Sequence, residues 1–423
     1  MTDTTEFSTS IPEQQSAGDG DAGDGDAGDV EPARKTTTTR RLARWLLPPL
    51  LAFLLAHGVL LLALYAADGG VSRYVSPSLR VVWDAGQYLG IAKDGYTLAH
   101  CDPHRTPFEA TDWCGRAGWF PLYPAIMHDV HAVTGWDWEA LGWGLSEVFA
   151  FGVLVLVWWL LGATVTVANL ACLALAAVFP GSVYDHAVFP VSLCTLASLG
   201  CLGLLARGRW VTAGLAGAVA AASYPLGVLL APAVGLWLLV AGRGRPWARL
   251  LRGAAAGGLV VLGLVLVGVV MQRSVGHWDA YVKVQSSYGN GIHNPVATFW
   301  HNLLTPRLWH LSPARVIPRF HLWNAPKVEL VFLVVLVALA LWATLRRRPV
   351  VRADIAFALF MVTTWIVPLV IGGRVSQYRQ YALILPAVVL LRDLPRVVLL
   401  GLVAVAAACT CAMAVLFDVN MLI

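Results

Sequence analysis

The chain has 423 residues, of which 58% are hydrophobic and only 13% carry a charge. Soluble globular proteins carry about 25% charged residues, so this composition excludes a soluble protein and indicates a membrane protein with several spans. The formal net charge of +5 does not indicate nucleic-acid binding, because the basic residues form short clusters beside apolar runs rather than one continuous face.

The first forty residues are rich in Ser, Thr, Gln, Gly and Asp and offer almost no apolar surface to bury. We expect residues 1–40 to be a disordered acidic tail in the cytoplasm, followed by a transmembrane domain over residues 41–423. The Gly/Asp repeat at 18–29 lacks the apolar residue that each turn of a calcium-binding β-helix needs. No cleavable signal peptide is visible, so the first apolar segment should remain as an anchor.

Apolar segments long enough to cross a bilayer, which takes about 20 residues, recur along the rest of the chain. The segment 210–241 is longer, contains Pro225 and has basic residues on both flanks, so we divide it into two short helices. The predicted fold class is therefore an all-α polytopic membrane protein with about eleven spans. They are 45–67, 141–162, 164–180, 187–206, the two halves of 210–241, 250–271, 327–345, 353–372, 377–392 and 395–417.

Arginine clusters between the spans predict how the chain is oriented. They are Arg40, Arg41 and Arg44 before the first span, Arg346, Arg347, Arg348 and Arg352 between the eighth and ninth, and Arg392 and Arg396 between the last two. All of them fall on one side under this count, and the positive-inside rule assigns that side to the cytoplasm. We expect a multi-pass protein of the cell membrane with a cytoplasmic N-terminus and an extracytoplasmic C-terminus. The polar segments 68–140 and 273–326 then form two large loops with short interfacial helices on the extracytoplasmic face.

An acid lies early in the first of these loops. If the segment from Trp83 onward is a helix, Asp84, Gln87 and Tyr88 share one face at i, i+3 and i+4. A helix with such a mixed face suits the headgroup layer of a membrane. Asp84 also stands where a helix begins, so an N-terminal cap or a partner of the helix dipole is the alternative to a chemical role.

Two other features of the first loop concern cysteine and histidine. Cys101 and Cys114 could pair in an oxidising compartment, but the sequence does not give their separation, and both states stay open. His128 and His131, with Asp129 between them, have the i, i+3 spacing of some metal ligands. Asp129 and His131 point to different faces of a helix, so we assign no metal ligand, and a divalent cation is the less favoured alternative.

The loop carries two motifs in a fixed order. Trp83-Asp84, Tyr88, Ile91-Ala92 and Gly95-Tyr96 are followed by Phe120-Pro121-Leu122-Tyr123-Pro124. This order resembles the first outer loop of the PIG-V-like (GPI mannosyltransferase II-like) branch of the GT-C superfamily of membrane glycosyltransferases. Weaker points of resemblance are Phe179-Pro180-Gly181-Ser182-Val183, Gln285, Tyr288, Ser376, Arg379 and Tyr381. The resemblance extends from about residue 45 onward, and only the first loop is specific.

The resemblance implies a GT-C-like transferase that moves a sugar, usually mannose, from a polyprenyl-phosphate donor to a hydroxyl of a lipid, glycan or protein acceptor. It also implies that Asp84 is the general base, a role that contributes about 10²- to 10⁴-fold to a rate. Cations must then stabilise the departing phosphate, and we expect Arg379, Arg374 and Lys93 to do so. Snorkelling or stacking on tyrosine is the alternative for the arginines. The expected substrate-pocket residues are Trp83, Gln87, Tyr88, Gln285 and Tyr288.

Two positions depart from the family pattern. Val191 stands where the family has an acid, and Tyr224 stands where it has the arginine of an Arg-Pro pair. Asp185 and His186 could replace the missing acid, but we favour plain loop residues. A diverged, non-catalytic member therefore remains an alternative. A transporter or flippase for lipid-linked sugars is another, although we find no internal repeat and the spans are almost free of charge. The sequence does not identify the sugar, the acceptor or a partner subunit.

Overall fold

The computed structural model describes residues 33–68, 74–104, 106–242, 244–304, 325–347, 352–372 and 377–419, with side chains from residue 44 onward. Most of the expected tail, 1–40, lies outside these ranges. The chain divides into two units, Met1–Leu42 and Ala43–Ile423. All the described side chains belong to the second unit.

The described part of the chain is helical almost throughout, and six of its helices are long and apolar enough to cross a membrane. They are α1 (Ala33–Asp68), over Arg44–Ala66, α4 (Trp138–Leu160), α9 (Pro246–Val275), α12 (Ala325–Arg346), α13 (Arg352–Ile371), over Ala353–Ile371, and α15 (Arg396–Asp418). Each coincides with a predicted span. The all-α membrane class is therefore confirmed, whereas the number of eleven spans stays a prediction.

The other five predicted spans form shorter or broken elements. They are α5 (Val167–Ala177), α6 (Val191–Ala206), α7 (Trp210–Ser223), the 3₁₀ helix η5 (Pro225–Leu229) continued by α8 (Leu230–Ala241), and α14 (Gln377–Ala382) followed by the 3₁₀ helix η7 (Leu385–Leu391). The predicted division of 210–241 is confirmed, because α7 ends at Ser223 and proline begins the next element. Gly227 is needed at this break, since a Cβ there would lie 2.2 Å from the Ala220 carbonyl oxygen.

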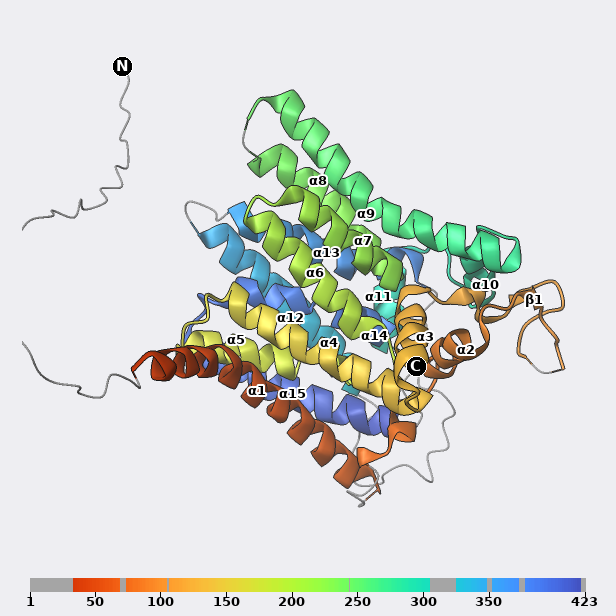
Figure 1. Ribbon diagram of the computed structural model, residues 1–423, viewed down its shortest axis with the longest axis horizontal. Helices are drawn as coiled ribbons and strands as arrows, with labels where there is room; N and C mark the ends of the chain where they lie inside the picture. The colour runs from red at the N-terminus through yellow and green to blue at the C-terminus, as the bar shows by residue number, and fades with distance from the viewer. Residues whose placement is uncertain are drawn as a thin grey trace, which may run out of the picture. The chain divides into compact units, whose positions relative to one another are not determined.

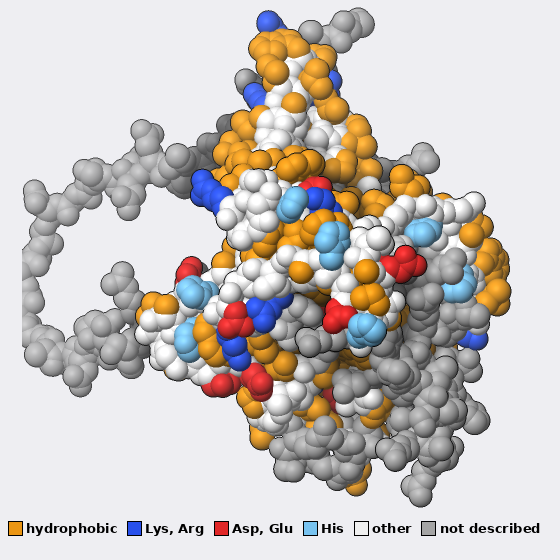
Figure 2. Space-filling view, turned by 90° about the vertical axis from the view of Figure 1, so that its right-hand side faces the viewer, with side chains coloured by type: hydrophobic (Ala, Val, Ile, Leu, Met, Phe, Trp, Pro, Cys, Tyr) orange, Lys and Arg blue, Asp and Glu red, His pale blue; other side chains and the backbone are white. Residues whose placement is uncertain are grey.

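Short elements from the two long polar segments gather at one end of the helices (Figure 1). They are the 3₁₀ helix η2 (Pro77–Arg80), α2 (Ala85–Asp94), β1 (Ala99–His100), β2 (Trp113–Cys114), the 3₁₀ helix η3 (Arg116–Gly118), α3 (Leu122–Thr134), α10 (Ala280–Ser287) and α11 (Pro295–Leu304). Viewed from that end, acidic, basic and histidine side chains lie together, whereas the part above them is largely apolar (Figure 2).

The two polar segments contact each other through hydrogen bonds. The Ser287 hydroxyl accepts from the Trp113 backbone N–H at 3.1 Å, and the Gln285 side-chain amide donates to the Gly118 carbonyl at 2.7 Å. Strands β1 and β2 pair antiparallel, with Ala99 opposite Cys114. Cys101 and Cys114 form a disulfide, which settles the pairing that the sequence left open.

The Phe-Pro-Leu-Tyr-Pro motif anchors this end to the helices. Phe120 and Tyr123 are fully buried, and the Tyr123 hydroxyl donates to the Gly142 carbonyl in α4 at 2.7 Å. The same hydroxyl lies 2.8 Å from the Ser146 hydroxyl. The motif therefore fixes α3, and the loop before it, against the first full turns of α4.

Arginines from the predicted cytoplasmic clusters converge on one acid. Asp354, buried near the start of α13, pairs with Arg347 and, at 2.9 Å, with Arg392. Arg347 also pairs with Asp393 at 2.6 Å. These arginines therefore hold α12, α13 and η7 together in addition to any role in topology.

Candidate active site

Asp84 lies at the start of α2, but its carboxylate does not cap the helix. It occupies the N-cap position, and no side-chain capping bond is formed. The preceding residue, Trp83, has a φ of 54°, a left-handed conformation that is uncommon for residues with a side chain. The capping alternative is therefore wrong, and the carboxylate is free for another contact.

That contact is an ion pair with Arg379 of α14. A guanidinium N–H donates to Asp84 Oδ2 across a separation of 295 residues. The side chains are only 24% and 14% exposed, so solvent screens the pair weakly. The sequence predicted separate roles for these two residues, and the structure brings them into direct contact.

Aromatic side chains surround the pair. Arg379 lies over the ring of Phe189, 5.7 Å from its centroid, and the charges of Arg379 and Asp84 act on the buried Tyr224. Tyr88 is buried, with its ring edge-on to Phe189. Tyr224 is one of the two departures from the family pattern, so that departure falls at the site itself. Val191, the other, is completely buried.

Tyrosines of α10 and its end complete one side of the site. The charges of Asp84 and Arg379 act on both Tyr281 and Tyr288. Burial, and then the negative charge of Asp84, raise the pKa of Tyr288 above its ordinary value. Burial also raises the pKa of Tyr88 well above the usual range. These phenols therefore stay protonated at neutral pH and can donate hydrogen bonds to a ligand.

The other residues expected in the pocket take different positions. The side-chain amide of Gln285 donates to Gly118 and so joins the two polar segments, and its side-chain carbonyl accepts from Asn290 at 2.6 Å. Gln87 is half-buried on α2, and Trp83 packs against the apolar core. Lys93 is exposed in the last turn of α2, nine residues after Asp84 and roughly 13 Å from it along the helix axis. Arg374 lies outside the described residues.

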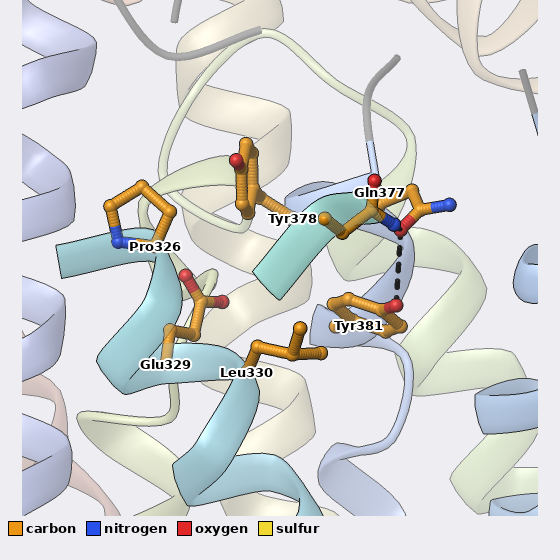
Figure 3. Close-up of a pocket in the computed structure, with 7 residues that line it drawn as sticks. Pro326, Glu329, Leu330, Gln377, Tyr378 and Tyr381 are labelled. Atoms are coloured by element: carbon orange, nitrogen blue, oxygen red, sulfur yellow. Dashed lines mark hydrogen bonds between the residues drawn. The ribbon is translucent and has the colours of Figure 1, made fainter. Parts of the chain in front are cut away.

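A small pocket lies on the other side of α14 (Figure 3). It is lined by Asn302, Pro326, Glu329, Leu330, Gln377, Tyr378 and Tyr381. The Tyr381 hydroxyl donates to the Gln377 side-chain carbonyl at 3.1 Å. One short helix therefore presents Arg379 to Asp84 and three other side chains to this pocket.

Glu329 is the unexpected member of the pocket. Its side chain is fully buried, and neither carboxylate oxygen has a hydrogen-bond partner among the described residues. It acts electrostatically on Tyr184, as do Arg379 and Asp84. An acid within an apolar span is a signal of function, but the high mean hydropathy of the segment hides it in the sequence.

A second polar cluster joins His57 of α1, Glu147 of α4 and His186, which follows the 3₁₀ helix η4 (Ser182–Tyr184). His57 and Glu147 lie inside predicted spans and were not singled out from the sequence. Asp185 and His186 are not plain loop residues as expected, because both are buried. Burial and the nearby Glu147 carboxylate raise the pKa of Asp185 to about 8.

His128 and His131, whose spacing is that of some metal ligands, form other contacts. His128 Nδ1 lies 2.9 Å from the Ala92 carbonyl oxygen, and His131 Nδ1 lies 2.7 Å from that of Trp136. The His131 ring also stacks on Trp138, with centroids 3.7 Å apart. Within the described ranges, the side chains that could share an ion are those of the second cluster, His57, Glu147 and His186.

Comparison with known proteins gave no matching family model and no matching curated protein. The chain is similar to two crystal structures of the Archaeoglobus fulgidus oligosaccharyltransferase. The structure tethered with an acceptor peptide containing the NVT sequon gives a TM-score of 0.46 at 12% identity, over 88% of this chain and 55% of that one. The complex with Zn and sulfate gives 0.44 at 13% identity, over 87% and 52%. This chain thus spans about half the length of either solved chain.

Proposed function

We propose that the protein is a membrane glycosyltransferase that uses a polyprenyl-phosphate sugar donor, with Asp84 as general base. The observation that carries the proposal is the contact between Asp84 and Arg379. It unites a group able to take a proton with a group able to bind a phosphate. The resemblance of the first loop supports GT-C-type chemistry and a PIG-V-like, mannosyl-transferring enzyme.

The ion pair has a clear role in such a reaction. In the free protein the two charges neutralise each other. A guanidinium binds phosphate oxygens well, so the donor phosphate can take over Arg379 and release the Asp84 carboxylate. The acceptor hydroxyl then attacks the anomeric carbon and gives its proton to Asp84. The bond from that carbon to the phosphate oxygen breaks, and its electron pair leaves with the phosphate beside Arg379.

The surroundings of the pair suit a sugar. Tyr88, Tyr224, Tyr281 and Tyr288 offer aromatic rings and phenolic hydroxyls close to the charges. Sugars present both apolar faces and hydroxyls, which rings and phenols match. Tyr224 replaces a family arginine, so we propose that the donor phosphate depends on Arg379 more heavily here than in the family. Arg374 and Lys93 remain predicted contributors to phosphate binding.

The acceptor is a lipid, glycan or protein on the extracytoplasmic face of the cell membrane. This placement rests on the arginine clusters and can be tested by labelling. Trp278 and Arg346 are both exposed, so only the side of the membrane on which each lies should decide whether a cysteine there reacts. With a membrane-impermeant thiol reagent added from outside, Trp278→Cys should be modified and Arg346→Cys should not. The opposite pattern would reverse the proposed orientation.

The central experiment compares lipid-linked and protein-linked glycans by mass spectrometry in cells with and without the gene. Wild-type chain should restore the missing glycan, and Asp84→Asn should not. Asp94→Asn is the matched control, because it makes the same change at the other end of α2, at an exposed side chain. Detergent gel filtration must show that both variants fold. Full activity of folded Asp84→Asn would contradict the assignment of the base.

A flippase for lipid-linked sugars would give a different result. Purified protein in vesicles would move a labelled polyprenyl-phosphate sugar between leaflets without changing it chemically. Cleavage of the sugar from its phosphate, dependent on an acceptor, is what the transferase requires.

A further inference from the structure

The cluster of His57, Glu147 and His186 takes no part in the proposed sugar transfer. Three elements distant in the sequence bring these side chains to one point, with all their candidate ligand atoms within 4.8 Å of one another. Glu147 Oε2 is the centre, 2.8 Å from His186 Nδ1 and 3.2 Å from His57 Nε2. The arrangement does not include the Asp84–Arg379 pair.

We propose that these three side chains bind a divalent transition-metal ion of the Zn²⁺ class. Two imidazoles and one carboxylate are a ligand set that zinc accepts with one position left open. The imidazoles favour Zn²⁺, Co²⁺ or Ni²⁺ over Mg²⁺ and Ca²⁺, which prefer oxygen ligands.

The distances between the candidate ligand atoms are close to those around a bound ion, so the side chains would need to move only slightly. Two ligands that each lie about 2.1 Å from a tetrahedral ion are about 3.4 Å apart. The distances from the Glu147 oxygen to the two imidazole nitrogens are 3.2 and 2.8 Å, so small rotations of the side chains would open the site to that size. The side chains of His57 and Glu147 are 20% and 16% exposed, which leaves an ion a way in.

Two of the atoms that would not touch the ion, one on His57 and one on Glu147, are held by neighbours. His57 Nδ1 is hydrogen-bonded to the Tyr74 hydroxyl, and the Trp143 indole N–H donates to Glu147 Oε1 at 2.6 Å. Such partners orient metal ligands and fix the tautomer of histidine. The ring of Phe53 packs edge-on to His57, with centroids 4.4 Å apart, and supplies an apolar wall. A ligand set, its supporting hydrogen bonds and an apolar wall are therefore all present.

The charge of the cluster also favours a cation. Glu147 is an acid within a candidate span, and its neighbours within hydrogen-bond distance are two imidazoles and an indole. A carboxylate in such a place is costly without a countercharge. A divalent ion would supply that charge and tie α1, α4 and the connection after η4 together. Tyr184 of the same connection packs edge-on to Phe189, the ring that Arg379 covers, so the ion would also steady one wall of the active site.

The test uses purified full-length protein stripped with a chelator, dialysed and titrated with Zn²⁺, with bound metal measured by mass spectrometry. We expect one tightly bound equivalent in the wild type and at least a tenfold loss of affinity in His57→Gln, Glu147→Gln and His186→Gln. His128→Gln is the matched control, because it makes the same change at a histidine that is also hydrogen-bonded but is exposed and lies outside the cluster. It should bind like the wild type.

A second measurement needs no variant. Co²⁺ added to the wild type should give the visible absorption of a four-coordinate ion with nitrogen ligands, saturating at one equivalent and displaced by Zn²⁺. Absence of saturable binding to the wild type would overturn the proposal and leave Glu147 hydrogen-bonded between two histidines. Equal Zn²⁺ affinity of folded His186→Gln and wild type would overturn it as well. Neither result depends on whether the protein transfers a sugar.

Discussion

Two polar clusters among the described residues, the Asp84–Arg379 pair and the His57–Glu147–His186 cluster, balance charge in different ways. In the first, the Asp84 carboxylate has a permanent cation, Arg379, as its partner. In the second, the Glu147 carboxylate is held by the imidazoles of His57 and His186, which carry no permanent charge. The first cluster is therefore complete until a substrate anion competes for the guanidinium. The second is suited to receive a cation. An acid with a built-in partner and an acid without one point to different ligands.

The largest expected effect is a loss of sugar transfer when the side chain of Asp84 is lengthened by one methylene group, and it distinguishes the two clusters. Asp84→Glu keeps the charge but moves the carboxylate by about 1 Å, and we expect sugar transfer to fall about 100-fold. Its Zn²⁺ stoichiometry should stay at one. Glu147→Asp should do the reverse, with weaker metal binding and transfer within a few-fold of wild type. Loss of transfer and metal together in both variants would show that the clusters form a single site.

Breaking the ion pair should lower stability. Arg379→Gln leaves a largely buried carboxylate without its cation, and we expect a loss of about 1–3 kcal/mol in the free energy of unfolding. The double variant Asp84→Asn with Arg379→Gln should recover part of this loss, because neither charge then remains. Thermal unfolding in detergent measures both, with the exposed Arg396→Gln as control. Strict additivity of the two single changes would mean that the contact contributes little.

A smaller effect is expected from the partner of His57. Tyr74→Phe removes the hydroxyl that is bonded to His57 Nδ1 and leaves the ring in place. Partners of metal ligands contribute about 10- to 100-fold to affinity, and we expect about tenfold weaker Zn²⁺ binding by competition with a chelator. Tyr65→Phe, at an exposed position of α1, should change nothing. An unchanged affinity in Tyr74→Phe would mean that the hydroxyl does not orient the ligand.

The smallest effect should come from Glu329, the acid that has neither a cation nor a hydrogen-bond donor among the described residues. Glu329→Gln replaces it by a neutral group of the same shape. Because no contact is lost and a buried charge without a partner is itself costly, the free energy of unfolding should fall by no more than about 0.5 kcal/mol. A loss above that in thermal unfolding would mean that the carboxylate has a bound partner.

The sequence predicted the first cluster far better than the second, for a physical reason. Asp84 stands in a polar loop with a recognisable motif, and Arg379 stands at the edge of a span, where charge is conspicuous. Their contact could not be predicted, since it joins residues that only the tertiary fold brings together. Glu147 and Glu329 are single acids within segments of high mean hydropathy. A single acid changes that mean little, so the hydropathy of a span does not reveal it. The long spans followed from hydropathy alone, whereas the broken ones, such as 377–392, depend on packing.

The separation between Asp84 and Arg379 also affects how the protein is made. Arg379 follows Asp84 by 295 residues, so a growing chain exposes the first loop long before the arginine exists. Until then Asp84 has no Arg379 guanidinium to meet. The pair therefore forms later than contacts within the first loop and between that loop and α4. Incomplete chains thus lack a finished centre, and a truncation before α14 would leave the Asp84 carboxylate permanently without its cation.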